Sequence, residues 1–254
     1  MKSTRTLVAA TALLASTAVG AFAKDAYKIA TEGAYPPFNF VDPSGKLQGF
    51  EIELGNAICA KMEAKCEWVI QDFDGTIPGL LAGKFDFAMT SMSITPERKK
   101  TIDFSDKYYS TAAVFTVPKN STITDVSPQA LQGKTIAAQS STIHAAMLED
   151  KYASVTTRLY PTLDEAFMDL KSGRVDAVFG DKLATAPWLK SEAGDCCHTV
   201  GGDITDPSFG PGVGVALKQG NDELKARLNK AIKDVVDDGT YKSINDKYFP
   251  FSIY

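Results

Sequence analysis

A run of hydroxyl-bearing residues that ends in an arginine is the segment of this chain best suited to bind a small anion. It covers residues 90–98 (Thr-Ser-Met-Ser-Ile-Thr-Pro-Glu-Arg) and directly follows an apolar strand pattern at residues 87–89. Hydroxyls and backbone N–H groups at a strand end, with a guanidinium one turn later, suit a carboxylate, which an arginine can bind through two parallel hydrogen bonds. An ordinary helix start at Thr95-Pro96, with Arg98 in solvent, explains the same residues. The local sequence leaves both interpretations open.

Signatures of catalysis are sparse elsewhere. The sequence has no G-x-S-x-G, H-E-x-x-H or P-loop motif. The glycine-rich run at residues 210–214 precedes a strand pattern, so it predicts close backbone packing rather than nucleotide binding. His144 and His198 are the only histidines, and His144 lies just inside an expected helix start, where a surface or supporting position is more common than catalysis. We therefore predict no catalytic residue, no metal site and no cofactor.

The composition favours a globular protein that does not bind nucleic acid. Of its 254 residues, 44% are hydrophobic and 23% charged, which is the ordinary range for one large or two medium domains. The 27 basic and 31 acidic residues give a formal charge of −4. A mildly acidic chain without a basic run is poorly suited to phosphate backbones.

The first 23 residues have the pattern of a cleavable signal peptide. Lys2 and Arg5 precede an apolar, small-residue stretch at residues 7–19, and an A-x-A cleavage site follows at residues 21–23. A membrane anchor is the alternative, but the apolar stretch is short for a bilayer. We predict an exported protein that begins at Lys24.

The four cysteines of an exported chain meet oxidising conditions, which favour disulfides. Cys59 and Cys66 lie on either side of an expected helix end, and the residues between them allow a turn that brings their Cα atoms to bridging distance. We favour a disulfide between them. Cys196 and Cys197 are adjacent, next to His198, and could be a vicinal disulfide, two free thiols or half of a metal site. Zinc is the weakest of these alternatives because the chain has so few histidines.

Strand and helix patterns alternate along two stretches of the remaining chain. The first opens with a β-type run at residues 27–31, and the second begins near Val114. The clearest helix, at residues 162–172, has apolar side chains at the i, i+3, i+4 and i+7 positions, namely Leu163, Ala166, Phe167 and Leu170. This alternation predicts two α/β layers with mainly parallel sheets, and ligands then lie beyond the carboxyl ends of the strands.

Several motifs resemble the polar amino acid family of periplasmic solute-binding proteins of ABC importers (solute-binding protein family 3). They occur at residues 30–38, 49–54 (Gly-Phe-Glu-Ile-Glu-Leu), 72–75 (Asp-Phe-Asp-Gly), 90–95, 239–241 and 247–249. The resemblance covers essentially all of residues 24–254. It is closest to the lysine/arginine/ornithine- and histidine-binding branch, with opine-binding proteins as near cousins.

The resemblance implies an α/β fold of the type II periplasmic-binding-protein (Venus flytrap) kind, in which two lobes joined by two hinge strands close over one ligand. Lobe 1 would comprise residues 24–110 and 206–254, and lobe 2 residues 114–202. The hinges would lie at about 111–113 and 203–205. The family's disulfide falls on Cys59–Cys66, in agreement with the spacing, whereas Cys196-Cys197 has no usable counterpart.

The resemblance also implies how the two poles of an amino acid are bound. Arg98 would bind the α-carboxylate, with the backbone N–H groups of Ser93 and of the helix start at Thr142-Ile143 as further donors. The branch usually has glycine where Ser141 stands and a hydroxyl residue in place of Ile143, so one side-chain contact is lost and the backbone donors remain.

The α-ammonium would donate to Asp181, together with the carbonyl of Thr90 and the hydroxyl of Ser91. Tyr35 and Phe73 would lie on either side of the ligand's methylene chain. Their faces could also bind a guanidinium.

Glu32 would face the far end of the ligand side chain, with Gln139 lining the pocket. The branch commonly has aspartate here, and glutamate is found in the opine binders. Because Arg98 and Asp181 match the two charges of a zwitterion, Glu32 remains unmatched in a water-poor cleft, and a second positive charge on the ligand is expected. The alternative is that Glu32 stays solvated at the cleft rim.

These residues predict the periplasmic substrate-binding component of an ABC importer in a Gram-negative cell. We expect a monomer that binds arginine, ornithine, lysine or histidine and delivers it to the inner-membrane permease. An opine-binding component is the first alternative, although Asp181 best fits a primary ammonium. A periplasmic enzyme resembling cyclohexadienyl dehydratase, with Glu32 as an acid, is the second.

Overall fold

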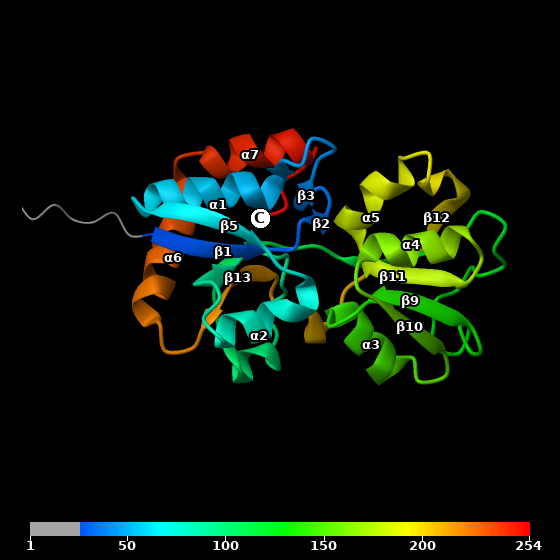
Figure 1. The fold of residues 1–254 in the computed structure, drawn as a ribbon. Coiled ribbons are helices and arrows are strands. Elements are labelled where there is room, and N and C mark those ends of the chain that lie inside the picture. Colours follow the sequence, from blue (N-terminus) through cyan, green and yellow to red (C-terminus); the bar gives the residue numbers. More distant parts are fainter. Residues whose placement is uncertain (1–25) are drawn as a thin grey trace, which may run out of the picture.

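The protein folds into two α/β bodies that lie side by side (Figure 1). The structure is a computed structural model and describes residues 26–254. The predicted signal peptide, residues 1–23, lies outside the described residues. Within residues 26–254, no helix combines the length and the apolar character needed to cross a bilayer.

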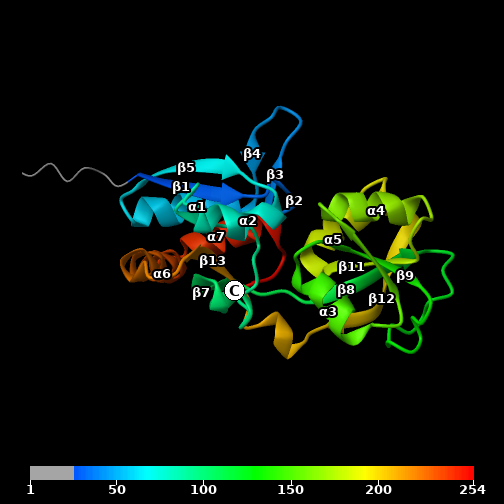
Figure 2. The same cartoon turned by 60° about the horizontal axis from the view of Figure 1, so that its bottom comes forward.

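The first body is built on a five-stranded sheet in the order β5-β1-β6-β13-β7. Helices α1, α6 and α7 pack on one face of this sheet, and α2 packs on the other. A small antiparallel sheet, β2-β3-β4, lies at the end that faces the second body (Figure 2). The bounds are β1 (Ala26–Thr31), β2 (Ala34–Tyr35), β3 (Asn39–Val41), β4 (Leu47–Gln48), α1 (Phe50–Lys61), β5 (Lys65–Ile70), α2 (Thr76–Leu81), β6 (Phe87–Ala88), β7 (Ile102–Tyr109), β13 (Val213–Lys218), α6 (Asp222–Asp237) and α7 (Thr240–Tyr248).

The second body is built on a five-stranded sheet in the order β10-β9-β11-β8-β12. Its helices are α3, α4 and α5, and all of them contact β11. The bounds are β8 (Ala113–Pro118), β9 (Thr135–Gln139), α3 (Ile143–Lys151), β10 (Thr156–Tyr160), α4 (Leu163–Lys171), β11 (Ala177–Asp181), α5 (Lys182–Leu189) and β12 (Cys197–Ile204). Short 3-10 helices are η1 (Phe73–Gly75), η2 (Arg98–Lys100), η3 (Gly194–Cys196) and η4 (Pro207–Phe209).

Each sheet is mainly parallel, as predicted, with four strands in one direction and one reversed strand, β13 in the first sheet and β8 in the second. In the first sheet β1 is parallel to β5 and β6, whereas β13 is antiparallel to β6 and β7. In the second, β9 is parallel to β10 and β11, whereas β8 is antiparallel to β11 and β12. A helical crossover makes neighbouring strands parallel. Strands β8 and β13 instead enter their sheets from the other body, so no crossover within their own sheet sets their direction.

The two bodies are connected at residues 110–112 and 205–212, between the strands of the two sheets. In the second connection, Phe209 packs in the core of the second body and Asp206 pairs with Lys151 of α3. Residues 206–209, which the family resemblance places in lobe 1, contact the second body through these two residues. Gly210 has a φ of 76°, and a Cβ there would lie 1.8 Å from the carbonyl oxygen of Ile94. This close approach confirms the predicted role of the glycine-rich run in backbone packing.

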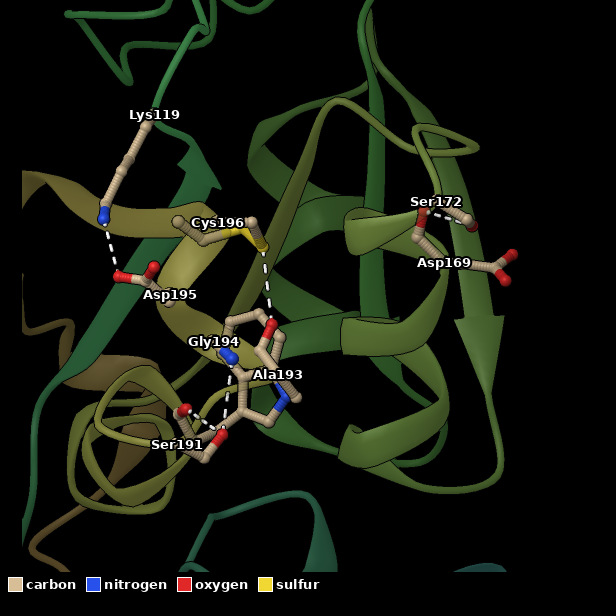
Figure 3. Close-up of a disulfide and its surroundings, with 10 residues drawn as sticks. Lys119, Asp169, Ser172, Ser191, Ala193, Gly194, Asp195 and Cys196 are labelled. Atoms are coloured by element: carbon tan, nitrogen blue, oxygen red, sulfur yellow. Dashed lines mark hydrogen bonds and ion pairs between the residues drawn. A yellow bond between two sulfur atoms is a disulfide. The ribbon is translucent and has the colours of Figure 1, made fainter.

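The structure contains two disulfides. The predicted Cys59–Cys66 pair is confirmed, with Cα atoms 6.3 Å apart, and it joins the end of α1 to β5. Of the three alternatives for Cys196 and Cys197, the structure has the vicinal disulfide (Figure 3). It lies where η3 meets β12, beside the Lys119–Asp195 ion pair. Within residues 26–254, no cysteine is free.

Candidate ligand-binding site

A cavity of about 410 Å³ lies between the two bodies, and every ligand-site residue assigned from the sequence lines it. These residues are Glu32, Tyr35, Phe73, Thr90, Ser91, Ser93, Arg98, Gln139, Thr142, Ile143 and Asp181. Four of them stand at or just beyond the carboxyl ends of β1, β6, β9 and β11, as expected for an open α/β sheet. The connecting segments complete the walls with residues 110–113, 205–206 and 209–213, which the sequence reasoning did not assign.

Arg98 faces this cavity rather than bulk solvent. Its Nη1 donates to the carbonyl of Ser93 and its Nη2 to the carbonyl of Ser141 on the second body, each at 2.9 Å. Its guanidinium carbon lies 5.6 Å from the centre of the Phe73 ring, within cation–π range. Burial lowers the pKa of Arg98 to about 10, so the group stays charged at neutral pH. The remaining N–H donors can bind an anion in the cavity.

Asp181 ends β11 and caps the N-terminus of α5. Its Oδ1 accepts hydrogen bonds from the backbone N–H groups of Leu183 and Ala184, at 2.6 and 3.1 Å, and from the Thr111 hydroxyl at 3.1 Å. Among residues 26–254, no donor reaches its Oδ2. Burial raises the pKa of Asp181 to about 6. A buried carboxylate with one free oxygen is a suitable acceptor for an ammonium group.

Glu32 directly follows β1 and is only 5% exposed, so the alternative of a solvated rim carboxylate is wrong. Its Oε1 accepts a hydrogen bond of 2.7 Å from Nε2 of Gln139, which lies on the second body. Burial raises the pKa of Glu32 to about 7, and the negative charges of Glu51, Asp72 and Asp74 act in the same direction. A cation beside Glu32 would offset both effects, because it stabilises the ionised carboxylate.

Tyr35 and Phe73 line the cavity from the first body, and each is 7% exposed. Tyr35 lies in β2 and its ring stacks on Phe38, with the ring centres 5.9 Å apart. Phe73 begins η1 and supports Arg98. The arrangement thus gives Phe73 a contact to the arginine that the sequence reasoning missed. That the two rings enclose a ligand chain remains a prediction.

The start of α3 forms part of the opposite wall. Thr142 caps this helix: its Oγ1 accepts from the N–H of Ala145 at 3.2 Å and donates to the carbonyl of Gln139 at 2.7 Å. Its hydroxyl is therefore already used within the second body. The free backbone N–H groups of the first helical turn, beginning at Ile143, are the donors that remain for an anion.

His144 is buried in the same wall, whereas the sequence suggested a surface or supporting position. Its ring packs edge-on against Phe179 and Phe209. Burial, reinforced by the charge of Arg98, lowers its pKa to about 3, so the imidazole is neutral. Within residues 26–254, no group of three or more His, Cys, Asp or Glu side chains is arranged to hold a metal ion.

Within residues 26–254, hydrogen bonds between three pairs of residues join the two bodies. They join Gln139 to Glu32 at 2.7 Å, Arg98 to the carbonyl of Ser141 at 2.9 Å, and the Ser140 hydroxyl to Asp74 at 2.8 and 2.9 Å. The bodies are thus closed on each other. A ligand that contacts both of them stabilises this closed arrangement over an open one.

Comparisons with known proteins give a family match and several similar relatives. Residues 27–251 match the family described as "Bacterial extracellular solute-binding proteins, family 3". The L-arginine-binding protein of Pseudomonas aeruginosa is 42% identical over 232 residues, which cover 89% of each chain. The lysine/arginine/ornithine-binding periplasmic protein of Escherichia coli is 36% identical, with 94% of each chain covered. The structure of an ancestral arginine-binding protein bound to arginine superimposes with a TM-score of 0.82 and 37% identity, covering 89% of this chain and 99% of that one.

Proposed function

Because the chain belongs to the bacterial extracellular solute-binding proteins, family 3, we propose that it is the substrate-binding component of an ABC importer and binds a cationic L-amino acid. It would be exported after cleavage at Ala23, work in the periplasm as a monomer, and deliver its ligand to an inner-membrane permease. The main support for a cationic ligand is the buried carboxylate of Glu32, which lines the cavity together with Asp181 and Arg98.

Each pole of the ligand is assigned to a set of groups that comes from both bodies. Arg98 binds the α-carboxylate, with the N–H groups of Ser93 and of the α3 start as additional donors. The free Oδ2 of Asp181 accepts from the α-ammonium, together with the Thr90 carbonyl and the Ser91 hydroxyl. Support comes from the presence of these groups around one cavity of about 410 Å³.

The side-chain end of the ligand lies at Glu32 and Gln139, between Tyr35 and Phe73. Arg98 and Asp181 neutralise a zwitterion. Asp206, which also lines the cavity, is paired with Lys151, so the negative charge that remains belongs to Glu32. Leaving a carboxylate unpaired in a dry cavity is costly. Arginine, ornithine, lysine and histidinium supply the missing positive charge, and the relatives named as arginine and lysine binders support this ligand class.

The cavity lining favours an amino acid over an opine. An opine carries a second carboxylate and therefore requires a second cationic partner. Arg98 is the only lysine or arginine among the described residues that line the cavity, and His144 is neutral. An enzyme such as a cyclohexadienyl dehydratase is the remaining alternative, and it would convert its ligand rather than retain it.

A thermal-shift panel tests the proposed ligand class. At about 100 times its dissociation constant, a ligand adds about 2.7 kcal/mol of stability. For a chain of this size we expect Tm to rise by roughly 5–10 °C with arginine, ornithine, lysine or histidine and to stay unchanged with glutamate. No shift with any basic amino acid would contradict the proposal. A shift with octopine alone would support an opine, and chemical conversion of the added ligand would support an enzyme.

The Ser140–Asp74 hydrogen bond lies outside the assigned ligand contacts and should govern how long the closed form lasts. Replacing Ser140→Ala removes a bond worth about 1 kcal/mol. We expect arginine to dissociate roughly five times faster, with little change in the association rate, as measured by stopped-flow fluorescence. Ser154→Ala is the matched control, because that exposed hydroxyl donates to the Pro128 carbonyl within the second body. An unchanged dissociation rate in Ser140→Ala would contradict this role.

A further inference from the structure

Glu51 is a fully buried carboxylate that lies behind the ligand cavity without lining it. It is the second residue of α1. Its Oε1 accepts hydrogen bonds from the backbone N–H of Ser91, at 2.8 Å, and from the Tyr108 hydroxyl. Its Oε2 accepts from Nδ2 of Asn39 at 2.6 Å and from the Ser91 hydroxyl at 3.1 Å. The peptide N–H and the amide NH₂ can only donate, so they stabilise the ionised carboxylate, whereas burial raises the pKa of Glu51 above its ordinary value.

Burying a carboxylate in this way lowers the stability of the fold. Within residues 26–254, no lysine or arginine pairs with Glu51, and hydrogen bonds alone compensate for its loss of hydration. Apolar residues of similar volume are commonly at least as stabilising as a buried charge. The location of Glu51 in the interior therefore calls for a role other than stability.

The first consequence of Glu51 is the position of Ser91. This residue has a φ of 54°, in the left-handed region that side chains other than glycine rarely adopt. The Glu51 carboxylate accepts hydrogen bonds from both the N–H and the hydroxyl of Ser91. Glu51 thus fixes the segment from Thr90 to Ser93, at which the poles of the amino acid are bound under the proposed function.

The second consequence concerns the other end of the site. Asn39, which donates to Glu51, uses its Oδ1 to accept from the N–H of Gly33 at 2.7 Å. Gly33 directly follows Glu32. One carboxylate therefore connects the segment that receives the α-groups with the segment that receives the side-chain charge. Its negative charge also raises the pKa of two acidic groups of the cavity, Glu32 and Asp181.

We propose that Glu51 is a positioning and specificity-determining residue: it sets the spacing between the two ends of the site, and its charge favours cationic over neutral amino acids. The proposal rests on the proposed function, since it concerns the same cavity. It goes further by assigning ligand discrimination to a residue that touches no ligand.

The test compares L-arginine with L-citrulline, its neutral analogue of nearly the same shape, by calorimetry. The change Glu51→Gln keeps the size of the side chain, removes its charge and turns an NH₂ group toward donors. We expect the preference for arginine over citrulline to fall about tenfold, because a charge several ångströms away is lost. A residue with a purely structural role would weaken both ligands equally.

The pH profile gives a second readout. Glu32 is faced by Gln139, Glu51, Asp72 and Asp74. Removing the charge of Glu51 should move the pH midpoint of arginine binding downward, because Glu32 then ionises more easily. An unchanged midpoint together with an unchanged arginine-to-citrulline ratio would overturn the proposal.

If Glu51→Gln fails to fold, two less disruptive variants test the role of Glu51. Tyr108→Phe removes one donor to Glu51, whereas Tyr109→Phe removes a neighbouring buried hydroxyl that has no partner among residues 26–254. We expect Tyr108→Phe to weaken arginine binding severalfold and Tyr109→Phe to leave it unchanged. Equal effects would overturn the proposal. Failure of the wild-type protein to bind any basic amino acid would instead overturn the proposed function.

Discussion

Replacing Arg98→Ala should abolish measurable binding of every amino acid. The substitution leaves the ligand carboxylate in the cavity without its bidentate partner, and breaking such a buried charge pair costs about 3–5 kcal/mol. A loss of about 4 kcal/mol corresponds to roughly 1,000-fold in the dissociation constant. The same change also removes the hydrogen bond from Arg98 to the carbonyl of Ser141, so the closed form loses a contact between the bodies. Isothermal calorimetry measures the effect directly.

Two further variants distinguish this role from general damage to the fold. Arg98→Lys keeps the charge and loses the planar pair of donors, so its affinity should lie between those of the wild type and Arg98→Ala. Arg174→Ala is the matched control, because Arg174 is an exposed arginine of the second body that pairs with Asp169. Tight binding retained in Arg98→Ala would show that the carboxylate is bound elsewhere.

Replacing Glu32→Gln should selectively weaken cationic ligands. The guanidinium or ammonium of the ligand loses its charged partner inside the cavity, at a cost of about 2–4 kcal/mol, or roughly 30- to 1,000-fold. The side chain of citrulline is neutral and forms no charge pair with Glu32, so the affinity for citrulline should change little. Calorimetry with arginine and citrulline on both proteins gives the comparison. Equal losses for the two ligands would mean that Glu32 does not recognise the charge of the side chain.

The pH dependence of arginine binding supplies an internal check on the same residue. Glu32 has a pKa of about 7 and must ionise to bind a cation, so arginine binding releases a proton below that pH. Affinity should therefore rise as the pH increases from about 5.5 to 8 and then level off, with Asp181, whose pKa is about 6, adding to the lower part of the rise. Glu32→Gln should lose the upper part of this dependence.

The sequence predicted most reliably the features that depend on neighbouring residues. The apolar spacing at residues 162–172 predicted α4, and the structure confirms it with a capping box between Thr162 and Glu165. The Cys59–Cys66 disulfide was also predictable, because a short loop restricts its ends. The resemblance to a known family identified the residues of the cavity, which local patterns alone left ambiguous at Arg98.

Features that depend on contacts between distant segments were not predictable. The direction of β8 and β13 follows from their passage between the bodies, which no local pattern records. His144 is buried because Phe209 packs on it from a segment 65 residues later, and the Ser140–Asp74 contact spans 66 residues. Glu51 was part of the motif that indicated the family, yet its hydrogen bonds to Asn39, Ser91 and Tyr108 could be recognised only in three dimensions.

A crystal structure of the protein with bound L-arginine tests the central claim most directly. We predict that the α-carboxylate pairs with Arg98, that the α-ammonium donates to Oδ2 of Asp181, and that the guanidinium lies against the carboxylate of Glu32. An arginine bound in the reverse direction, or one whose guanidinium points into solvent away from Glu32, would contradict the account.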